Sequence, residues 1–109
     1  MRISNSYILA GIGAAMLLTG ATAASARPAI VLYQQDYFRG ASYEPRRDEP
    51  DLGWVHFDDR ASSIEVNRGV WLVCADSRFR GRCVEVDHDV RKLSDLGMDD
   101  KISSVRRIR

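Results

Sequence analysis

From residue 27 onward the chain consists of short runs of β-branched and aromatic residues, separated by polar turns that contain glycine. Apolar and polar positions alternate in several of these runs. In one of them Ile64 and Val66 fall on one face and Ser63 and Glu65 on the other, the pattern of a half-buried strand. No segment keeps a helical period for more than two turns. The pattern predicts an all-β protein with strands at 29–35, 41–44, 62–66, 70–75, 82–87 and 103–108.

The sequence matches itself once, without a gap, at an offset of 41 residues. Ten residues of the first unit are identical to their counterparts in the second: Phe38, Arg39, Gly40, Glu44, Asp48, Leu52, Asp58, Asp59, Ser62 and Ser63. Segments 45–55 and 88–97 are polar, with room for one short strand or helical turn each. A duplicated four-strand unit predicts a sandwich of two Greek keys, about eight strands in two sheets, divided into 28–68 and 69–109.

Two motifs in each unit resemble those of the βγ-crystallin family. The spacing Tyr33-x4-Phe38-x-Gly40 is similar to the family's aromatic, aromatic, glycine signature, whose glycine has a positive φ. The segments 58–63 (Asp-Asp-Arg-Ala-Ser-Ser) and 99–104 (Asp-Asp-Lys-Ile-Ser-Ser) resemble the family's calcium motif. In the second unit Cys74 replaces the first aromatic residue, so a bridge to Cys83 is expected to hold that hairpin.

The resemblance implies two calcium ions of modest affinity, each held by oxygens from both units, because calcium takes six to eight oxygen ligands. One ion would be held by the Asp59 carboxylate, the Ser103 hydroxyl and the carbonyls of Gln34 and Lys101. The other would be held by Asp100, Ser62 and the carbonyls of Ala75 and Arg60. Asp58 and Asp99 would orient these ligands or bind through water. The cationic side chains of Arg60 and Lys101 would weaken binding.

The same turns also have an interpretation without a metal. Aspartate and serine in turns often accept or donate hydrogen bonds to their own backbone, so that Ser62 and Ser63 would only begin a strand. Both interpretations stay open at this point.

Residues 1–26 have the features of a signal peptide. An early positive charge at Arg2 precedes an apolar stretch at 7–18, and Ala24-Ser25-Ala26 is a small-x-small cleavage site. The apolar stretch is short for a membrane span, which needs about 20 residues; an uncleaved anchor is the alternative. We expect cleavage after Ala26, a single domain at 27–109, and a secreted or periplasmic protein.

The only two cysteines, Cys74 and Cys83, lie on either side of a predicted hairpin turn at 76–81. An exported protein meets an oxidising compartment, where an even number of cysteines favours a disulfide. We therefore predict a Cys74–Cys83 bridge, with two unbridged thiols as the alternative.

Charge and motif content exclude several classes of function. Residues 27–109 carry 15 Lys plus Arg and 15 Asp plus Glu, which argues against nucleic acid as a partner. The basic stretch 106–109 is either a handle for anionic lipid or polysaccharide, or a solvated strand end. His56 and His88 are not equivalent in the repeat, and the chain contains no phosphate loop, HExxH or GxSxG motif. We do not expect an enzyme.

Three functions remain. The first is an exported calcium-binding module with a structural, stress or envelope-associated role. The second is an inhibitor of secreted metalloproteases, as in small secreted proteins that this chain resembles in fold, acting through an exposed loop at 46–54 or 76–81. The third, a toxin-like or carbohydrate-contacting module, has only Trp54 and the terminal arginines as candidate residues, Trp54 being a contact residue if it is exposed.

Overall fold

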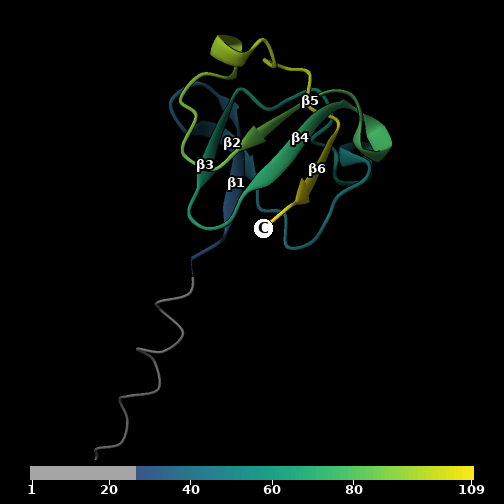
Figure 1. Cartoon of the computed structure of the whole chain (residues 1–109). Helices are drawn as coiled ribbons and strands as arrows, with labels where there is room; N and C mark the ends of the chain where they lie inside the picture. The colour runs from purple at the N-terminus through teal and green to yellow at the C-terminus, as the bar shows by residue number, and fades with distance from the viewer. Residues whose placement is uncertain (1–26) are drawn as a thin grey trace, which may run out of the picture.

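Two three-stranded antiparallel sheets, one from each half of the repeat, form the part of the computed structural model that can be described, residues 27–109 (Figure 1). The first sheet has the order β2-β1-β3, with β1 at Ile30–Gln35, β2 at Arg39–Tyr43 and β3 at Ser63–Val66. The second has the order β5-β4-β6, with β4 at Trp71–Asp76, β5 at Arg80–Val86 and β6 at Ser104–Arg107. The predicted all-β fold is confirmed. The predicted signal peptide lies outside the described residues.

The two segments expected to supply a fourth strand to each unit form single bridges instead. Glu49 pairs with Val105 of the second sheet, and Val90 pairs with Ile64 of the first. Each bridge therefore joins one half of the chain to the sheet of the other half. Pro50 directly follows Glu49 and has no amide hydrogen to extend the pairing. Three short 3-10 turns complete the fold: η2 at Leu52–Val55, η3 at Ser77–Phe79 and η4 at Leu93–Leu96.

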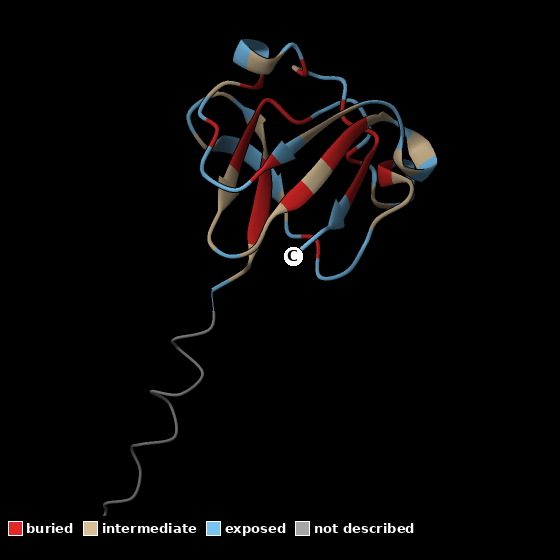
Figure 2. Ribbon diagram, in the orientation of Figure 1, coloured by how far each residue is buried: buried red, intermediate tan, exposed pale blue. Residues whose placement is uncertain are grey.

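The core lies between the two sheets, where their buried residues face each other (Figure 2). The repeat predicts its composition, since Ile64 and Val105 are equivalent and both fully buried, as are Leu52 and Leu93. Burial of a side chain of this size contributes about 1.5–3 kcal/mol. The other core residues are Ile30, Leu32, Phe57, Ala61, Trp71, Val73, Val86, Val90, Met98 and Ile102.

The first hairpin is closed by an aromatic pair and a serine. The rings of Tyr33 and Phe38 meet edge to face with centroids 5.9 Å apart, and Gly40 has a φ of +84°. Ser63, predicted on the polar face, is fully buried instead. Its hydroxyl donates to the Gln35 carbonyl at 2.6 Å and accepts from the Phe38 amide at 3.0 Å, so burial leaves its polar atoms satisfied.

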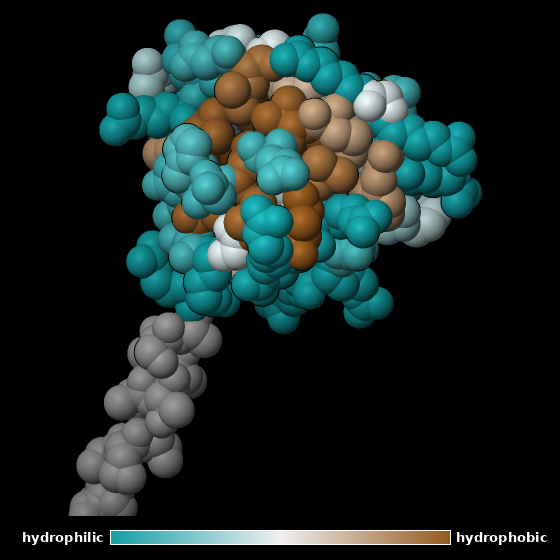
Figure 3. Space-filling model, viewed as in Figure 1, coloured by the Kyte–Doolittle hydropathy of each residue, from teal (hydrophilic) through white to brown (hydrophobic). Residues whose placement is uncertain are grey.

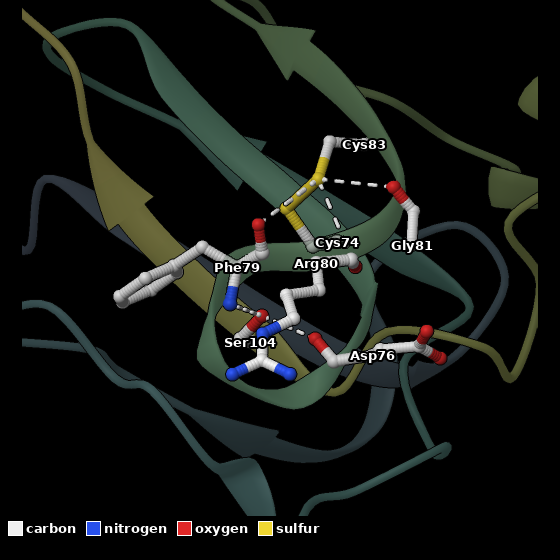
Figure 4. Close-up of a disulfide and its surroundings, with 7 residues drawn as sticks. All are labelled: Cys74, Asp76, Phe79, Arg80, Gly81, Cys83 and Ser104. Carbon is white, nitrogen blue, oxygen red and sulfur yellow. Dashed lines mark hydrogen bonds between the residues drawn. A yellow bond between two sulfur atoms is a disulfide. The ribbon is translucent and has the colours of Figure 1, made fainter.

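A disulfide occupies the same place in the second half, as predicted. Cys74 and Cys83 are directly opposed on β4 and β5 and are bonded (Figure 4). The carbonyl oxygens of residues 79–81 lie 3.7–3.9 Å from the Cys83 sulfur, which carries no hydrogen to donate while it is in the disulfide. Ser104 holds the hairpin as Ser63 does, donating to the Asp76 carbonyl and accepting from the Phe79 amide.

The outer surface is mainly hydrophilic, with apolar side chains gathered over the middle of the face shown in Figure 3. Among large hydrophobic residues, Trp54 is the most exposed, at 66%, followed by Tyr37 at 50%. Within residues 27–109 there is no helix with the length and apolar character needed to cross a membrane.

Candidate metal centre

The two Asp-Asp turns adopt the same left-handed backbone conformation. Asp59 has a φ of 56° and Asp100 a φ of 54°. Aspartate tolerates this region better than most residues, because its short side chain can bond locally. Each turn is held against the other half of the chain: the Asp59 amide donates to the Ile102 carbonyl at 3.1 Å, and the Asp100 amide donates to the Ala61 carbonyl at 3.0 Å. The repeat thus places the two turns side by side.

The acidic and hydroxyl groups of these turns meet in two crossed pairs. The Ser103 hydroxyl donates to Asp59 Oδ1 at 3.3 Å, and the Ser62 hydroxyl donates to Asp100 Oδ1 at 3.3 Å. Both serines are buried, whereas both aspartates are exposed. Each pair combines one residue from each half, at a sequence separation of 44 residues in one case and 38 in the other. Each pair therefore offers two hard oxygen ligands at the boundary between the halves.

Backbone oxygens beside these pairs are free to bind a further partner. Within residues 27–109, the carbonyls of Arg60 and Lys101 accept no hydrogen bond. The neighbouring carbonyls of Ala61 and Ile102 do accept one, from the amides of the opposite turn. The Arg60 and Lys101 carbonyls are the two that the family resemblance assigns to calcium.

The strand carbonyls of the expected ligand set come from Gln34 and Ala75, which stand at equivalent irregularities. Neither residue has a registered partner, because the β1–β2 and β4–β5 pairings each shift register there. The Ser62 amide donates to the Tyr33 carbonyl, and the Ser103 amide donates to the Cys74 carbonyl, both at 2.8 Å. Ser62 is therefore a neighbour of Gln34, and Ser103 of Ala75. This arrangement favours exchanging the two strand carbonyls between the ions of the expected scheme.

The first aspartate of each pair, Asp58 or Asp99, differs between the halves. Asp58 is exposed, whereas Asp99 is half-buried and its Oδ1 is fully enclosed. That atom is the one buried side-chain nitrogen or oxygen, among the described residues, that has no hydrogen-bond partner. A buried acceptor without a donor costs about 1–3 kcal/mol unless water or a cation satisfies it. Asp99 thus supports a polar occupant at the second turn.

The two cationic side chains beside the site take different directions. Arg60 Nη1 donates to the His56 carbonyl at 2.9 Å, and its guanidinium lies 5.6 Å from the centre of the Phe57 ring. This position holds the Arg60 charge in contacts outside the two Asp–Ser pairs. Lys101 is exposed and forms no ion pair within residues 27–109. Of the two, Lys101 is the cation that remains free to oppose a metal ion.

The donors around each pair fit a hard cation such as calcium. A carboxylate, a hydroxyl and backbone carbonyls are all oxygen ligands of the type that calcium takes. No cluster of three or more His, Cys, Asp or Glu side chains suited to a metal occurs between residues 27 and 109. Any metal here would therefore depend on mixed side-chain and backbone oxygens. The hydrogen bonds within each pair also match the interpretation without a metal, in which the turns only join the halves.

Sequence analysis missed the role of the second serine and of a repeated aspartate. Ser63 and Ser104 close the hairpins, as described above. Asp48 Oδ1 accepts from the Arg107 amide at 3.1 Å, and Asp89 Oδ1 accepts from the Val66 amide at 2.8 Å. Both aspartates and both serines are identical at an offset of 41 residues, and that identity was the available signal.

Comparison with known proteins decides the family. The profile described as Beta/Gamma crystallin matches residues 29–108. The chain belongs to the βγ-crystallin family. Among solved βγ-crystallins, the one from Ciona intestinalis is 31% identical, with a TM-score of 0.69, over 72% of this chain and 98% of that one. A βγ-crystallin from an archaeon is 28% identical, with a TM-score of 0.67, over 72% of this chain and 95% of that one.

Two further relatives are more distant or much longer. A βγ-crystallin domain from Flavobacterium johnsoniae is 24% identical with a TM-score of 0.65, covering 73% of this chain and 93% of that one, and it supports the fold alone. Human beta/gamma crystallin domain-containing protein 2 is 34% identical over 55 residues, which are 50% of this chain and 3% of that protein. The βγ-crystallin family is non-enzymatic, which confirms that His56 and His88 are not catalytic residues.

Proposed function

We propose that this βγ-crystallin protein is an exported calcium-binding module with a structural, stress or envelope-associated role. The observation that carries the proposal is the crossed pairing of Asp59 with Ser103 and of Asp100 with Ser62. The free carbonyls of Arg60 and Lys101 and the buried oxygen of Asp99 support it. The family's motif, present in both halves, agrees with it.

Calcium would supply positive charge at the boundary between the halves and so offset the negative charge of the aspartates. The residues of this chain do the rest: the buried serines fix the direction of their hydroxyls, and the left-handed turns present the carboxylates. Because each pair draws on both halves, binding favours the folded arrangement. At a free calcium concentration tenfold above Kd, one ion would stabilise the fold by about 1.4 kcal/mol. Calcium would thus adjust the stability of a fold that the core already maintains.

Isothermal titration of the demetallated protein with calcium tests the proposal. We expect saturable binding in the micromolar to millimolar range, with a parallel rise in melting temperature. Magnesium is the matched control, since it holds its waters and demands a more regular octahedral shell. We expect it to bind more weakly than calcium. Flat heats at millimolar calcium, with no change in melting temperature, would contradict the proposal and leave the Asp–Ser pairs as structural hydrogen bonds.

Export is the second part of the proposal and rests on residues 1–26. Expression of the full chain in a bacterial host, followed by fractionation, would show whether the protein leaves the cytoplasm. We expect Arg27 at the N-terminus of the exported form. Retention in the cytoplasm with Met1 intact would contradict export without affecting the calcium proposal.

Inhibition of secreted metalloproteases stays a second candidate because one of its loops carries Trp54, which is 66% exposed. The two candidate loops are joined by a hydrogen bond from the Arg78 amide to the Pro50 carbonyl. The same bond joins Tyr37 to Arg91 in the other half, so it belongs to the fold and does not mark an inhibitor. An assay against a panel of secreted metalloproteases, with Trp54→Ala as the comparison, would test this function.

A further inference from the structure

An arginine-rich cleft lies at the ends of β1 and β6 that are opposite to the candidate metal centre. It has a volume of about 610 Å³, within the range of small-ligand sites. Its charged lining consists of five arginines against two acidic residues: Arg27, Arg46, Arg47, Arg68, Arg107, Glu44 and Asp48. Hydrophilic residues cover this end of the molecule, close to residue 27 (Figure 3). The cleft is therefore a concave surface with an excess of positive charge.

Most of this charge is not neutralised by the protein. Within residues 27–109, the side chains of Arg46, Arg47 and Arg68 form neither an ion pair nor a hydrogen bond. Arg27 has a distant contact of 3.5 Å with Glu65. The Asp48 carboxylate is engaged with the Arg107 amide. Three guanidinium groups are thus available to an anion that enters the cleft.

One wall of the cleft is fixed by an indole ring. Trp71 is 3% exposed, its Nε1 donates to the Arg68 carbonyl at 2.9 Å, and the Arg107 guanidinium lies 5.8 Å from the ring centre. Arg107 Nε also donates to the Arg109 carbonyl at 2.9 Å. A Cβ at Gly69 would lie 2.6 Å from Arg107 Nε, so glycine leaves the space that this packing needs. The wall is held in place before any ligand binds.

The repeat provides an internal comparison for the cleft. The glutamate and the aspartate of the lining recur in the second half as Glu85 and Asp89, so they belong to the fold. The residues that give the cleft its charge and its aromatic wall do not recur. The counterparts of Arg46, Arg47, Trp71 and Arg107 in the other half are Asp87, His88, Ile30 and Val66. The basic cleft is therefore a specialisation of one half and not a consequence of the βγ-crystallin fold.

We infer that this cleft binds a compact ligand that carries phosphate groups, such as a phosphorylated sugar or a lipid headgroup. Guanidinium groups bind phosphate oxygens in bidentate fashion. Three free arginines also match a ligand with more than one negative charge, whereas a single carboxylate would leave most of the cleft unpaired. The opposite half carries Asp87, Asp89 and Glu85 at the matching positions, which would repel a long polyanion that extended around the domain. A compact anion is thus favoured over nucleic acid.

Titration of the protein with inorganic pyrophosphate, in calcium-free buffer, tests the inference. In a Trp54→Phe background Trp71 is the single tryptophan and reports directly from the wall of the cleft. We expect saturable binding by calorimetry and a change in Trp71 fluorescence, both weakened by added salt. We also expect Arg46→Ala/Arg47→Ala to raise Kd by about tenfold or more.

The matched control is Arg80→Ala/Arg91→Ala, which removes the same charge from exposed positions outside the cleft. We expect it to leave Kd nearly unchanged. The absence of saturable pyrophosphate binding at low salt would overturn the inference, as would an equal loss of affinity in the control variant. Calcium binding is measured separately, so its failure would leave this result intact.

Vesicles distinguish the two sources of phosphate. Co-sedimentation with phosphatidylcholine vesicles that contain phosphatidic acid, absent for pure phosphatidylcholine and lost in Arg46→Ala/Arg47→Ala, would support a lipid headgroup as the ligand. Pyrophosphate binding without co-sedimentation would support a soluble phosphorylated ligand.

Discussion

The hydroxyl of Ser103 donates to the carboxylate of Asp59 at 3.3 Å, although the two residues belong to different halves of the chain. Its counterpart, Ser62 with Asp100, has the same length and the opposite direction along the sequence. Neither half therefore contains a complete pair. Any ion held by one pair must depend on residues from both halves.

The crossed pairing predicts which variants lose the same ion. Asp59→Ala and Ser103→Ala should each abolish one of the two calcium sites, and the double variant should retain the other site. Combining Asp59→Ala with Ser62→Ala should abolish both sites, because these residues belong to different pairs. Calorimetric stoichiometry measures this directly. Uncrossed sites, each built within one half, would give the reverse pattern for these two double variants.

Lys101→Ala should strengthen calcium binding by about two- to fivefold at low salt, because it removes a free positive charge beside the site. Arg60→Ala should have a smaller effect, since the Arg60 guanidinium is engaged with the His56 carbonyl. Arg46→Ala is the control for charge alone, because it lies in the cleft at the other end of β1. A gain in affinity that is equal in all three variants would show a dependence on net charge alone.

Reduction of the Cys74–Cys83 disulfide should lower the free energy of unfolding by about 2–3 kcal/mol, the amount that the chain-entropy model gives for so short a loop. It should also weaken calcium binding by Asp59 and Ser103 more than by Asp100 and Ser62. The reason is that the Ser103 amide donates to the Cys74 carbonyl. Denaturation and calcium titration with and without dithiothreitol measure both effects. A Cys74→Ala/Cys83→Ala variant should not respond to the reductant.

Alkaline pH should destabilise the protein through Tyr43. Burial, and secondarily the hydrogen bond that its phenol donates to Glu49, raise the pKa of Tyr43 from 10.0 to about 12. Because the folded state holds this proton more tightly than the unfolded state, the contribution is complete below pH 10.0. It declines as the pH rises through about 12.

Thermal denaturation across this range checks the alkaline prediction. Tyr43→Phe should lose less stability between neutral and alkaline pH than the natural protein does. Tyr37→Phe is the control, since the Tyr37 hydroxyl makes no hydrogen bond within residues 27–109. Parallel pH profiles for the natural protein and Tyr43→Phe would assign the alkaline loss to other groups.

The sequence predicts much of this architecture because its repeat is free of gaps. Position 41 residues apart is equivalent, so the hairpins, the core residues Ile64 and Val105, and the approach of Asp59 to Ser103 follow from one alignment. The disulfide follows from the positions of two cysteines on either side of a turn. These features depend on local pattern and on the symmetry of the fold.

Features that depend on exchange between the halves were harder to predict. The segments around Glu49 and Val90 have too few apolar residues to show strand character, and their single bridges form only against the opposite sheet. The basic cleft is assembled from residues as far apart as Arg27 and Arg107. No local motif announces it. Burial of Ser63 was also mispredicted, because alternation describes side-chain polarity and takes no account of the hydrogen bonds that satisfy a buried hydroxyl.

The bridges from Glu49 to Val105 and from Val90 to Ile64 have a consequence for the origin of such a chain. A peptide equal to one half would present an incomplete sheet edge and one member of each ligand pair, and a second identical copy would complete both. Joining two copies in tandem replaces an encounter between molecules with one inside a single molecule, at a far higher effective concentration. Once joined, the copies were free to diverge, and an arginine pair in one half now stands opposite Asp87 and His88 in the other.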